Sequence, residues 1–444
     1  MKDLTEGKVG KQIVAFAMPM LLGNLFQQLY NVIDSVIVGQ YIGNEALAAV
    51  GASFPIIFLM ISLSNGIASG ISIVISQYFG AKDIKNVRKA IDTMYIFMIV
   101  ASVIMTFAGI YLGRMVFRIT ELPEEVMPGA VLYLNIFMGG YILFFGFHGT
   151  AAILRGLGDS KTPLYFMIFS TVLNIGLDLL LVLVFGMGIE GVAIASVISM
   201  GLAFLATVIY LNSKHELLRI RSIRLQFDRD ILRKSIRIGL PSGVQQMIVA
   251  LGMIFMFWIV NQFGTTTIAA FSIASRIDSM ASTPAMMFAA ALATFVGQNV
   301  GAGKLDRVKK GMQTTMIWTG SISVFVSLVV ILFGRQIMQL FTPDPAVIES
   351  GVSYLVIVCS FYIFFSTMFT FNGVLRGAGD TIIPMFITFF SLWVVRLPLS
   401  WYLSNNIGEH GIWWGIPIAW FCGMILAWVY YSTGHWKKKS VFHR

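Results

Sequence analysis

The sequence is poor in charge, in cysteine and in histidine. Only 12% of its 444 residues are charged, whereas soluble domains carry about 25%. The two cysteines, Cys359 and Cys422, both lie in apolar stretches and give no sign of a disulfide framework. The five histidines are scattered, and the sequence contains no GxSxG, HExxH or metal-spaced Cys/His motif. We therefore expect neither an enzyme nor a cofactor.

Long apolar runs recur along the whole chain. We count twelve, each long enough to cross a hydrocarbon core of about 30 Å as a helix. They cover residues 12–36, 46–77, 90–113, 128–154, 163–186, 189–212, 238–261, 267–298, 312–334, 350–375, 384–404 and 411–434. The sequence therefore predicts an all-α polytopic membrane protein with twelve transmembrane helices.

Basic residues gather on alternate connections between these spans, and the net charge is +10. With the N-terminus inside, the opposite side holds only Arg114, Arg118 and Arg335 of the 31 Lys and Arg residues, while Arg276 and Arg396 fall within spans. The positive-inside rule predicts both termini in the cytoplasm and the protein in the cell (plasma) membrane. The basic excess is then a topology signal, with membrane lipid rather than nucleic acid as its partner.

Two stretches of sequence occur twice. LRGLGDSKTP at Leu154–Pro163 returns as LRGAGDTIIP at Leu375–Pro384, 221 positions later. At the same offset, QYFGAKDIKNVRKA at Gln77–Ala90 returns as QNVGAGKLDRVKKG at Gln298–Gly311. The chain is thus predicted to consist of two related halves.

The repeat predicts an N-terminal six-helix lobe over 1–212, a basic cytoplasmic linker over 213–237 and a C-terminal six-helix lobe over 238–444. Six spans return the chain to its starting side, so the repeat is parallel, and we expect a V-shaped cleft between the lobes. Pro19 in the first span has a counterpart in Pro241, and we expect the first helix to bend near Pro19.

Polar residues inside the spans are the functional candidates, because ionisable groups in lipid are costly. In the first span five of them lie on one helical face, which must be wet or paired. They are Asn24, Gln27, Gln28, Asn31 and Asp34.

In the fifth span, Asn174 and Asp178 are four residues apart and stack one turn apart on a helix. An amide and a carboxylate that converge in this way can serve a proton or a Na⁺ ion. His148 lies in the fourth span, where it is either a hydrogen-bonding residue or a proton relay. Arg276, Asp278 and Arg396 are expected to find partners on neighbouring helices.

The chain resembles the multidrug and toxic compound extrusion (MATE) family over essentially its full length, and within it the DinF-like branch. The resemblance rests on Pro19 and YNVIDSVIVG in the first span, ILRGLGDSKTP after the fourth, NIGLD in the fifth, GVAIASVIS in the sixth, and LRGAGDT in the second half. It implies a two-lobed secondary active antiporter that exports small organic cations in exchange for H⁺ or Na⁺ by alternating access.

The resemblance also implies where the coupling cation binds. The family pattern falls on Asp34, Asn174, Asp178 and Ser196, with serine in place of the family's threonine. Na⁺, if it is the ion, is expected at the first three of these. Gln27, Asn31 and His148 are the candidates for the substrate cavity.

Two other functions stay open at this stage. A flippase for a lipid-linked precursor would belong to the same wider superfamily, although its cleft is expected to be basic. A receptor or scaffold without transport is the other. The sequence does not distinguish H⁺ from Na⁺ or name the substrate, and we expect a monomer.

Overall fold

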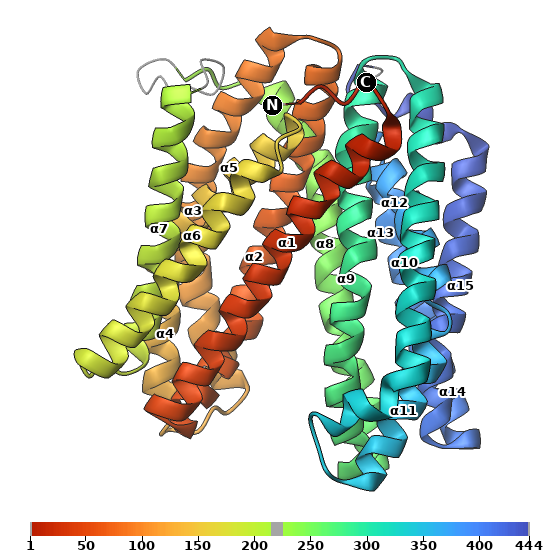
Figure 1. The fold of residues 1–444 in the computed structure, drawn as a ribbon. Coiled ribbons are helices and arrows are strands. Elements are labelled where there is room, and N and C mark those ends of the chain that lie inside the picture. Colours follow the sequence, from red (N-terminus) through yellow and green to blue (C-terminus); the bar gives the residue numbers. More distant parts are fainter. Residues whose placement is uncertain (1, 215–224, 443–444) are drawn as a thin grey trace. The chain divides into compact units, whose positions relative to one another are not determined.

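The computed structural model describes residues 2–214 and 225–442 and shows that these residues fold into helices without any strand (Figure 1). The all-α prediction is confirmed. The α-helices, in chain order, are α1 (Val9–Ile37), α2 (Asn44–Gly80), α3 (Ile84–Ile119), α4 (Met127–Gly139), α5 (Tyr141–Gly156), α6 (Lys161–Asp178), α7 (Ile189–Lys214), α8 (Arg229–Val260), α9 (Thr265–Gly301), α10 (Leu305–Gln339), α11 (Pro345–Cys359), α12 (Tyr362–Gly377), α13 (Ile382–Phe389), α14 (Leu397–Ile407) and α15 (Glu409–Thr433).

Twelve spans are present when each bent helix pair is counted as one. Ten helical segments of the described chain are long and apolar enough to cross a membrane alone. The other two spans are α4 with α5, bent by 50°, and α11 with α12, bent by 48°. The number of spans agrees with the prediction, whereas the two bends were not predicted, because hydrophobicity is uninterrupted across them.

Short π-helical segments continue three of the spans. They are η1 (Val38–Ile42) after α1, η2 (Leu179–Val184) after α6, and η5 (Phe390–Arg396) between α13 and α14. Such segments are frequent at functional sites, because the wider turn re-aims the side chains around it. Here η1 and η2 directly follow the two helices that carry Asp34 and Asp178.

The chain packs as two compact units. The first unit comprises residues 1–2 and 18–243, and the second unit comprises 3–17 and 244–444. Helix α1 therefore starts in the second unit and continues in the first, whereas α8 starts in the first unit and continues in the second. Pro19 and Pro241 lie inside these helices, close to the points where they pass from one unit to the other.

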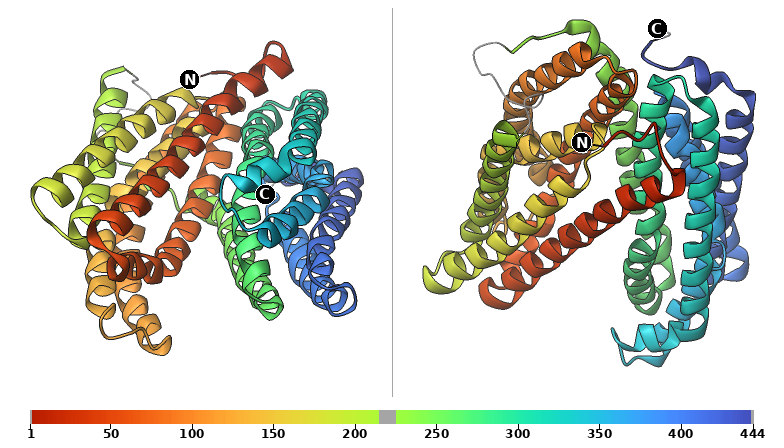
Figure 2. Two further views of the ribbon diagram at one scale, coloured as in Figure 1. Left: turned by 60° about the horizontal axis from the view of Figure 1, so that its bottom comes forward. Right: turned by 45° about the horizontal axis from the view of Figure 1, so that its top comes forward.

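Within each unit, long helices pack side by side. In the first unit α2 packs on α3, α4 and α5, and α6 packs on α7. In the second unit α9 packs on α10, α11 and α12, and α14 packs on α15 (Figure 2). The core of the second unit is rich in aromatic rings, with Phe271 stacked on Trp413 at a centroid distance of 5.7 Å.

The first unit contains a close crossing of α2 and the first part of α8. Gly66 and Gly70 of α2 face Gly243 and Gly239 of α8, and a Cβ atom added at Gly66 would lie 2.4 Å from the backbone nitrogen of Gly243. Each helix thus contributes a GxxxG pattern, which lets backbones approach closely in membranes. We did not predict this contact, because GxxxG patterns are common in membrane helices and only the fold shows which of them meet.

The repeated LRGxGD motif proves to be a structural device in both units. A Cβ atom added at Gly156 would lie 2.7 Å from the carbonyl oxygen of Ser72, and at Gly377 it would lie 2.4 Å from that of Ala293. Only glycine permits these helix contacts. The second glycine of each copy, Gly158 or Gly379, has a positive φ that ends the helix.

The polar residues of this motif form local bonds. Asp159 holds the start of α6, because its Oδ1 accepts the backbone N–H groups of Lys161 and Thr162. Arg376 donates to Gln245 within the second unit.

Candidate functional site

Helices α1 and α6 bring two acids and an amide together inside the first unit. Asn174, with its amide nitrogen turned toward the acids, donates to Asp34 Oδ1 at 2.9 Å and to Asp178 Oδ2 at 3.2 Å. The Asp34 carboxyl also lies within hydrogen-bonding reach of the Asp178 carboxyl. The i, i+4 spacing of Asn174 and Asp178 places both on the face of α6 that meets α1.

Hydroxyl groups complete the cluster. Ser196 of α7 is buried and lies 2.6 Å from the hydroxyl of Tyr30, and both lie within hydrogen-bonding reach of Asp34. Tyr133 of α4 is also buried and lies close enough to both acids to interact with them electrostatically. The structure thus places Asp34, Asn174, Asp178 and Ser196 in one site.

Tyr30 is a member of this site that the sequence reasoning missed. It lies four residues before Asp34, so it shares the acid's face of α1. The spacing of four residues between Tyr30 and Asp34 could have indicated this. Only amides and acids were selected as candidates in this span, because tyrosine is common in membrane spans.

The acid pair is shielded from solvent to different degrees and is incompletely paired, with Asp34 half-buried. Asn174 and Asp178 are fully buried, and Asp178 Oδ1 has no hydrogen-bond partner. Two neighbouring carboxylates in such surroundings cannot both stay charged unless a proton or a cation is shared between them. The repulsion between the two acids is therefore relieved when a proton or another monovalent cation lies between them.

Apolar clusters border the site along both helices. One turn beyond the acids, Ile37 and Val38 pack with Val182 and Val192. A second apolar cluster, centred on Phe147, Met167 and Met200, lies nearer the start of both helices. It packs with the aromatic rings of Phe26, Phe144, Phe166 and Phe204. Apolar side chains thus flank the acid cluster on both sides along these helices.

The substrate-cavity candidates lie outside the acid cluster. His148 packs against the rings of Phe144 and Phe147, at centroid distances of 4.4 and 5.5 Å, and its Nε2 atom has no partner. Gln27 is half-buried and Asn31 is exposed. The structure places His148 beside the aromatic cluster rather than beside Asp34.

The charged residues of the second unit form a separate network. Tyr362 donates to Asp278 Oδ1 at 2.5 Å and Tyr354 donates to Oδ2 at 3.5 Å, while Arg396 attracts the same carboxyl electrostatically. Asp278 and Arg396 thus have partners on neighbouring helices, as expected. Arg276 is exposed. Among the described residues, no three His, Cys, Asp or Glu side chains gather as a metal would require.

Helical spans that enclose a buried acid and amide cluster define a polytopic membrane transporter, and comparison with known proteins gives its family. The MatE family model matches residues 19–180 and again 241–402, so both matches begin at a proline of a unit-crossing helix. The chain therefore belongs to the MATE family of transporters, as the sequence motifs predicted.

Curated relatives match over nearly their full length. The chain is 33% identical to the probable multidrug resistance protein YpnP of Bacillus subtilis, over 99% of this chain and 98% of that protein. It is 27% identical to the probable multidrug resistance protein NorM of Thermotoga maritima, over 98% of this chain and 95% of that protein.

Solved structures show the same fold. An outward-facing conformation of a multidrug resistance MATE family transporter superposes with a TM-score of 0.92 at 25% identity, covering 99% of both chains. A MATE structure described as the bent conformation gives 0.92 at 25% identity, and one described as the straight conformation gives 0.91 at 26%. Each of these covers 98% of both chains.

Proposed function

We propose that the protein is a secondary active antiporter of the cell membrane that exports organic cations in exchange for H⁺ or Na⁺ by alternating access. The observation that carries the proposal is the Asp34–Asn174–Asp178 cluster, in which Asn174 and Asp178 are fully buried and one Asp178 oxygen has no partner. A site that is incomplete without a cation is what ion coupling requires. The relatives named as multidrug resistance proteins support the substrate class.

Either coupling ion can complete this site. A proton would be shared by the two carboxyls, with Asn174 donating to both of them. Na⁺ would be held by Asp34 and Asp178, with the amide of Asn174 turned so that its oxygen faces the ion. In both cases the bound cation removes the repulsion between the acids, and its departure restores it.

The exchange follows from competition between two states of the first unit. Cation binding stabilises the arrangement in which α1 and α6 are joined through the cluster. If the drug is bound only by the arrangement without the cation, then uptake of the cation releases the drug, because coupling between two ligands is reciprocal. Bending of α1 near Pro19 would change the shape of the drug site.

Topology follows from the distribution of Lys and Arg. Both termini are then in the cytoplasm, together with the α2–α3 and α9–α10 connections that carry the repeated basic sequence. A cysteine-accessibility scan of these two connections in intact cells would place them. Labelling of both from the outside would contradict this topology.

The test of the function uses purified protein in liposomes loaded with a fluorescent organic cation. An H⁺ gradient and then a Na⁺ gradient are imposed, and the loss of fluorescence from the lumen is followed. Movement driven by one of the two gradients establishes the antiporter and names its ion. Folded protein that responds to neither gradient contradicts the proposal and directs the test to lipid-linked substrates.

Tyr30→Phe is expected to weaken coupling without abolishing it. The change removes the hydroxyl that lies 2.6 Å from Ser196 and within reach of Asp34. Loss of one such hydrogen bond corresponds to about 0.5–1.5 kcal/mol, or roughly two- to tenfold in the cation concentration that gives half-maximal exchange. Tyr165→Phe, on an exposed part of α6, is the control and should match the wild type. If Tyr30→Phe and Tyr165→Phe both need the same cation concentration for half-maximal exchange, the Tyr30 hydroxyl does not take part in cation binding.

A further inference from the structure

Each helix that crosses between the units is tied down just before it begins. The two tied stretches are residues 3–8, ahead of α1, and 226–228, ahead of α8. The residues that tie them lie at the start of the third span of the same unit, next to the sequence that repeats at an offset of 221, and in the second unit also at the end of the second span. We call these contacts the first clasp, in the first unit, and the second clasp, in the second unit.

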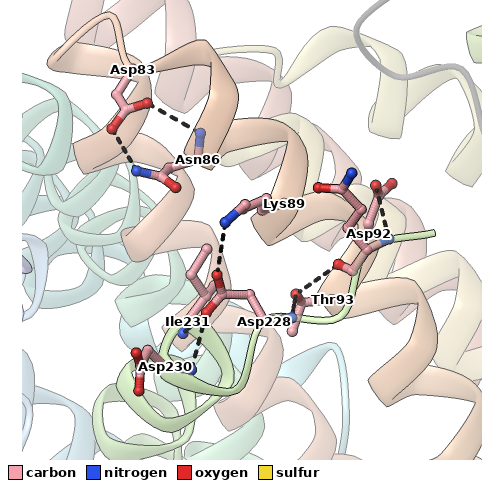
Figure 3. Close-up of polar contacts among 9 residues, drawn as sticks. Asp83, Asn86, Lys89, Asp92, Thr93, Asp228, Asp230 and Ile231 are labelled. Atoms are coloured by element: carbon pink, nitrogen blue, oxygen red, sulfur yellow. Dashed lines mark hydrogen bonds and ion pairs between the residues drawn. The ribbon is translucent and has the colours of Figure 1, made fainter. Parts of the chain in front are cut away.

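The first clasp holds the start of α8 (Figure 3). Lys89 Nζ lies 3.2 Å from Asp228 Oδ2, and the hydroxyl of Thr93 accepts the backbone N–H of Asp228 at 3.0 Å. Asp228 Oδ1 also accepts the backbone N–H groups of Asp230 and Ile231 at the first turn of α8. The N–H of Ile231, and to a lesser extent the ammonium of Lys89, lowers the pKa of Asp228. The carboxylate thus joins α3 to the first turn of α8.

The second clasp holds the start of α1 and is centred on Arg307. The guanidinium donates to the carbonyl oxygens of Gly7 and Leu4 at 2.9 and 3.2 Å, to Gln12 Oε1 at 3.0 Å, and to Asn299 Oδ1 at 3.0 Å. These acceptors lie in different directions, and only the planar fork of arginine reaches all of them.

Further bonds close the second clasp around a buried segment. Leu4 donates its N–H to Gln298 Oε1 at 2.9 Å, and Lys304 Nζ donates to the carbonyl oxygen of Thr5 at 3.0 Å. The side chains of Leu4 and Thr5 are buried, and so are Gln12 and Ile13 in the first turns of α1. The start of α1 is therefore an integral part of the second unit.

The two clasps use the same place in the repeat and different residues. Arg307 corresponds by the offset of 221 to Asn86. Asn86 donates to Asp83 and makes no bond to the described residues 226–228 ahead of α8. The first clasp uses Lys89, Asp92 and Thr93 in its place. The two units thus hold the start of a crossing helix at the same place in the repeat with different side chains. We infer that the fold requires this attachment rather than any particular residue pair.

The consequence concerns α1, which carries Asp34. Its beginning is fixed in the second unit by Arg307, it passes Pro19, and its far part holds Asp34 in the first unit. A helix that is held at both ends transmits a change at one end to the other, whereas a helix that is free at its start does not.

We propose that Arg307 is a positioning residue for coupling: it anchors the start of α1 to the second unit, so that cation binding at Asp34 is transmitted through α1 and drives drug release. This inference rests on the proposed antiport function. The hydrogen bonds of Arg307 all lie within the second unit and none reaches the acid cluster. Its loss leaves the acid cluster intact and separates cation movement from drug movement.

The test compares Arg307→Gln with Lys309→Gln, which removes the same charge from an exposed position of α10. In liposomes, the number of coupling cations moved per drug molecule and the cation leak without drug are measured for both. Arg307→Gln is expected to reduce gradient-driven drug movement about tenfold and to raise the leak, while the cation affinity stays within about twofold. Lys309→Gln is expected to equal the wild type.

Hydrogen exchange provides the structural readout. Amides of residues 3–17 should lose protection in Arg307→Gln, whereas those of residues 25–40 should keep it. Arg307→Lys, which keeps the charge and loses the fork, should behave as Arg307→Gln does, and it replaces that variant if the latter fails to fold. Unchanged coupling in a variant whose residues 3–17 exchange rapidly would overturn the inference. If the wild type moves no cation with the drug, the proposed function itself fails.

Discussion

Asp178→Asn is expected to abolish gradient-driven exchange, with a loss of about hundredfold. Asparagine has nearly the same shape as aspartate and cannot take up a proton or balance the charge of Na⁺. Asp178 is fully buried, accepts a bond from Asn174 and has one oxygen without a partner. The measurement is drug efflux from liposomes under the coupling gradient.

The companion variant Asp34→Asn should show the same loss, and the double variant should be no worse than either single one. Groups that act as a unit are not additive, since removing one member already disables the site. Thermal stability should stay equal or rise, because a buried charge is costly in lipid. A double variant that loses much more than each single variant would show that the acids act independently.

Asp278→Asn is the matched control in the second unit. The change removes a carboxylate that accepts hydrogen bonds from Tyr362 and Tyr354 and attracts Arg396 electrostatically. Removing its charge weakens the bonds from Tyr362 and Tyr354 and leaves Arg396 without the negative charge near it, which destabilises the second unit. We expect a lower unfolding temperature and unchanged dependence on the coupling cation. A loss of cation dependence in this variant would show that coupling is not confined to the first unit.

Gly70→Leu is expected to prevent the first unit from folding. A Cβ atom at this position would lie 2.3 Å from the carbonyl oxygen of Ser235 and 2.5 Å from the backbone nitrogen of Gly239. Backbone atoms cannot swing aside as side chains do, so α2 and α8 would have to separate. The measurement is the yield of monodisperse protein and its unfolding temperature in detergent.

Gly70→Ala gives a graded form of the same test. Overpacking by one methyl group is expected to cost about 1–3 kcal/mol. Gly51→Ala is the control in the same helix, because nothing lies within 4 Å of a Cβ atom there. Alanine is the better helix former by about 1 kcal/mol, so this variant should equal or exceed the wild type in stability. Equal stability of the two alanine variants would contradict the close crossing.

The spans were predictable because the cost of exposing backbone and charge to lipid acts on each segment separately. Every apolar run became helical, two of them as bent helix pairs, and the two matches of the family model are 222 residues apart, within one residue of the spacing between LRGLGDSKTP and LRGAGDTIIP. The bends at Gly140 and after Cys359 were not predictable, since they depend on what packs beside them.

The candidate site was predictable in part for a similar reason. Helical spacing alone pairs Asn174 with Asp178, and the family resemblance added Asp34 and Ser196. Tyr30 was not predicted because its contacts depend on which helix faces it. Its hydroxyl is hydrogen-bonded to Ser196, which lies 166 residues away in sequence. Helix faces are readable from sequence, whereas the pairing of faces is set by packing.

The sequence by itself determined that this chain is a twelve-span membrane protein built from two related halves, because apolar length and repeat register are local properties. Only the tertiary structure decided that α1 begins in one unit and ends in the other, that Arg307 holds its start, and that Gly66 and Gly70 meet α8. These contacts depend on which surfaces fit at close range, and the complementarity of two surfaces belongs to neither sequence segment alone.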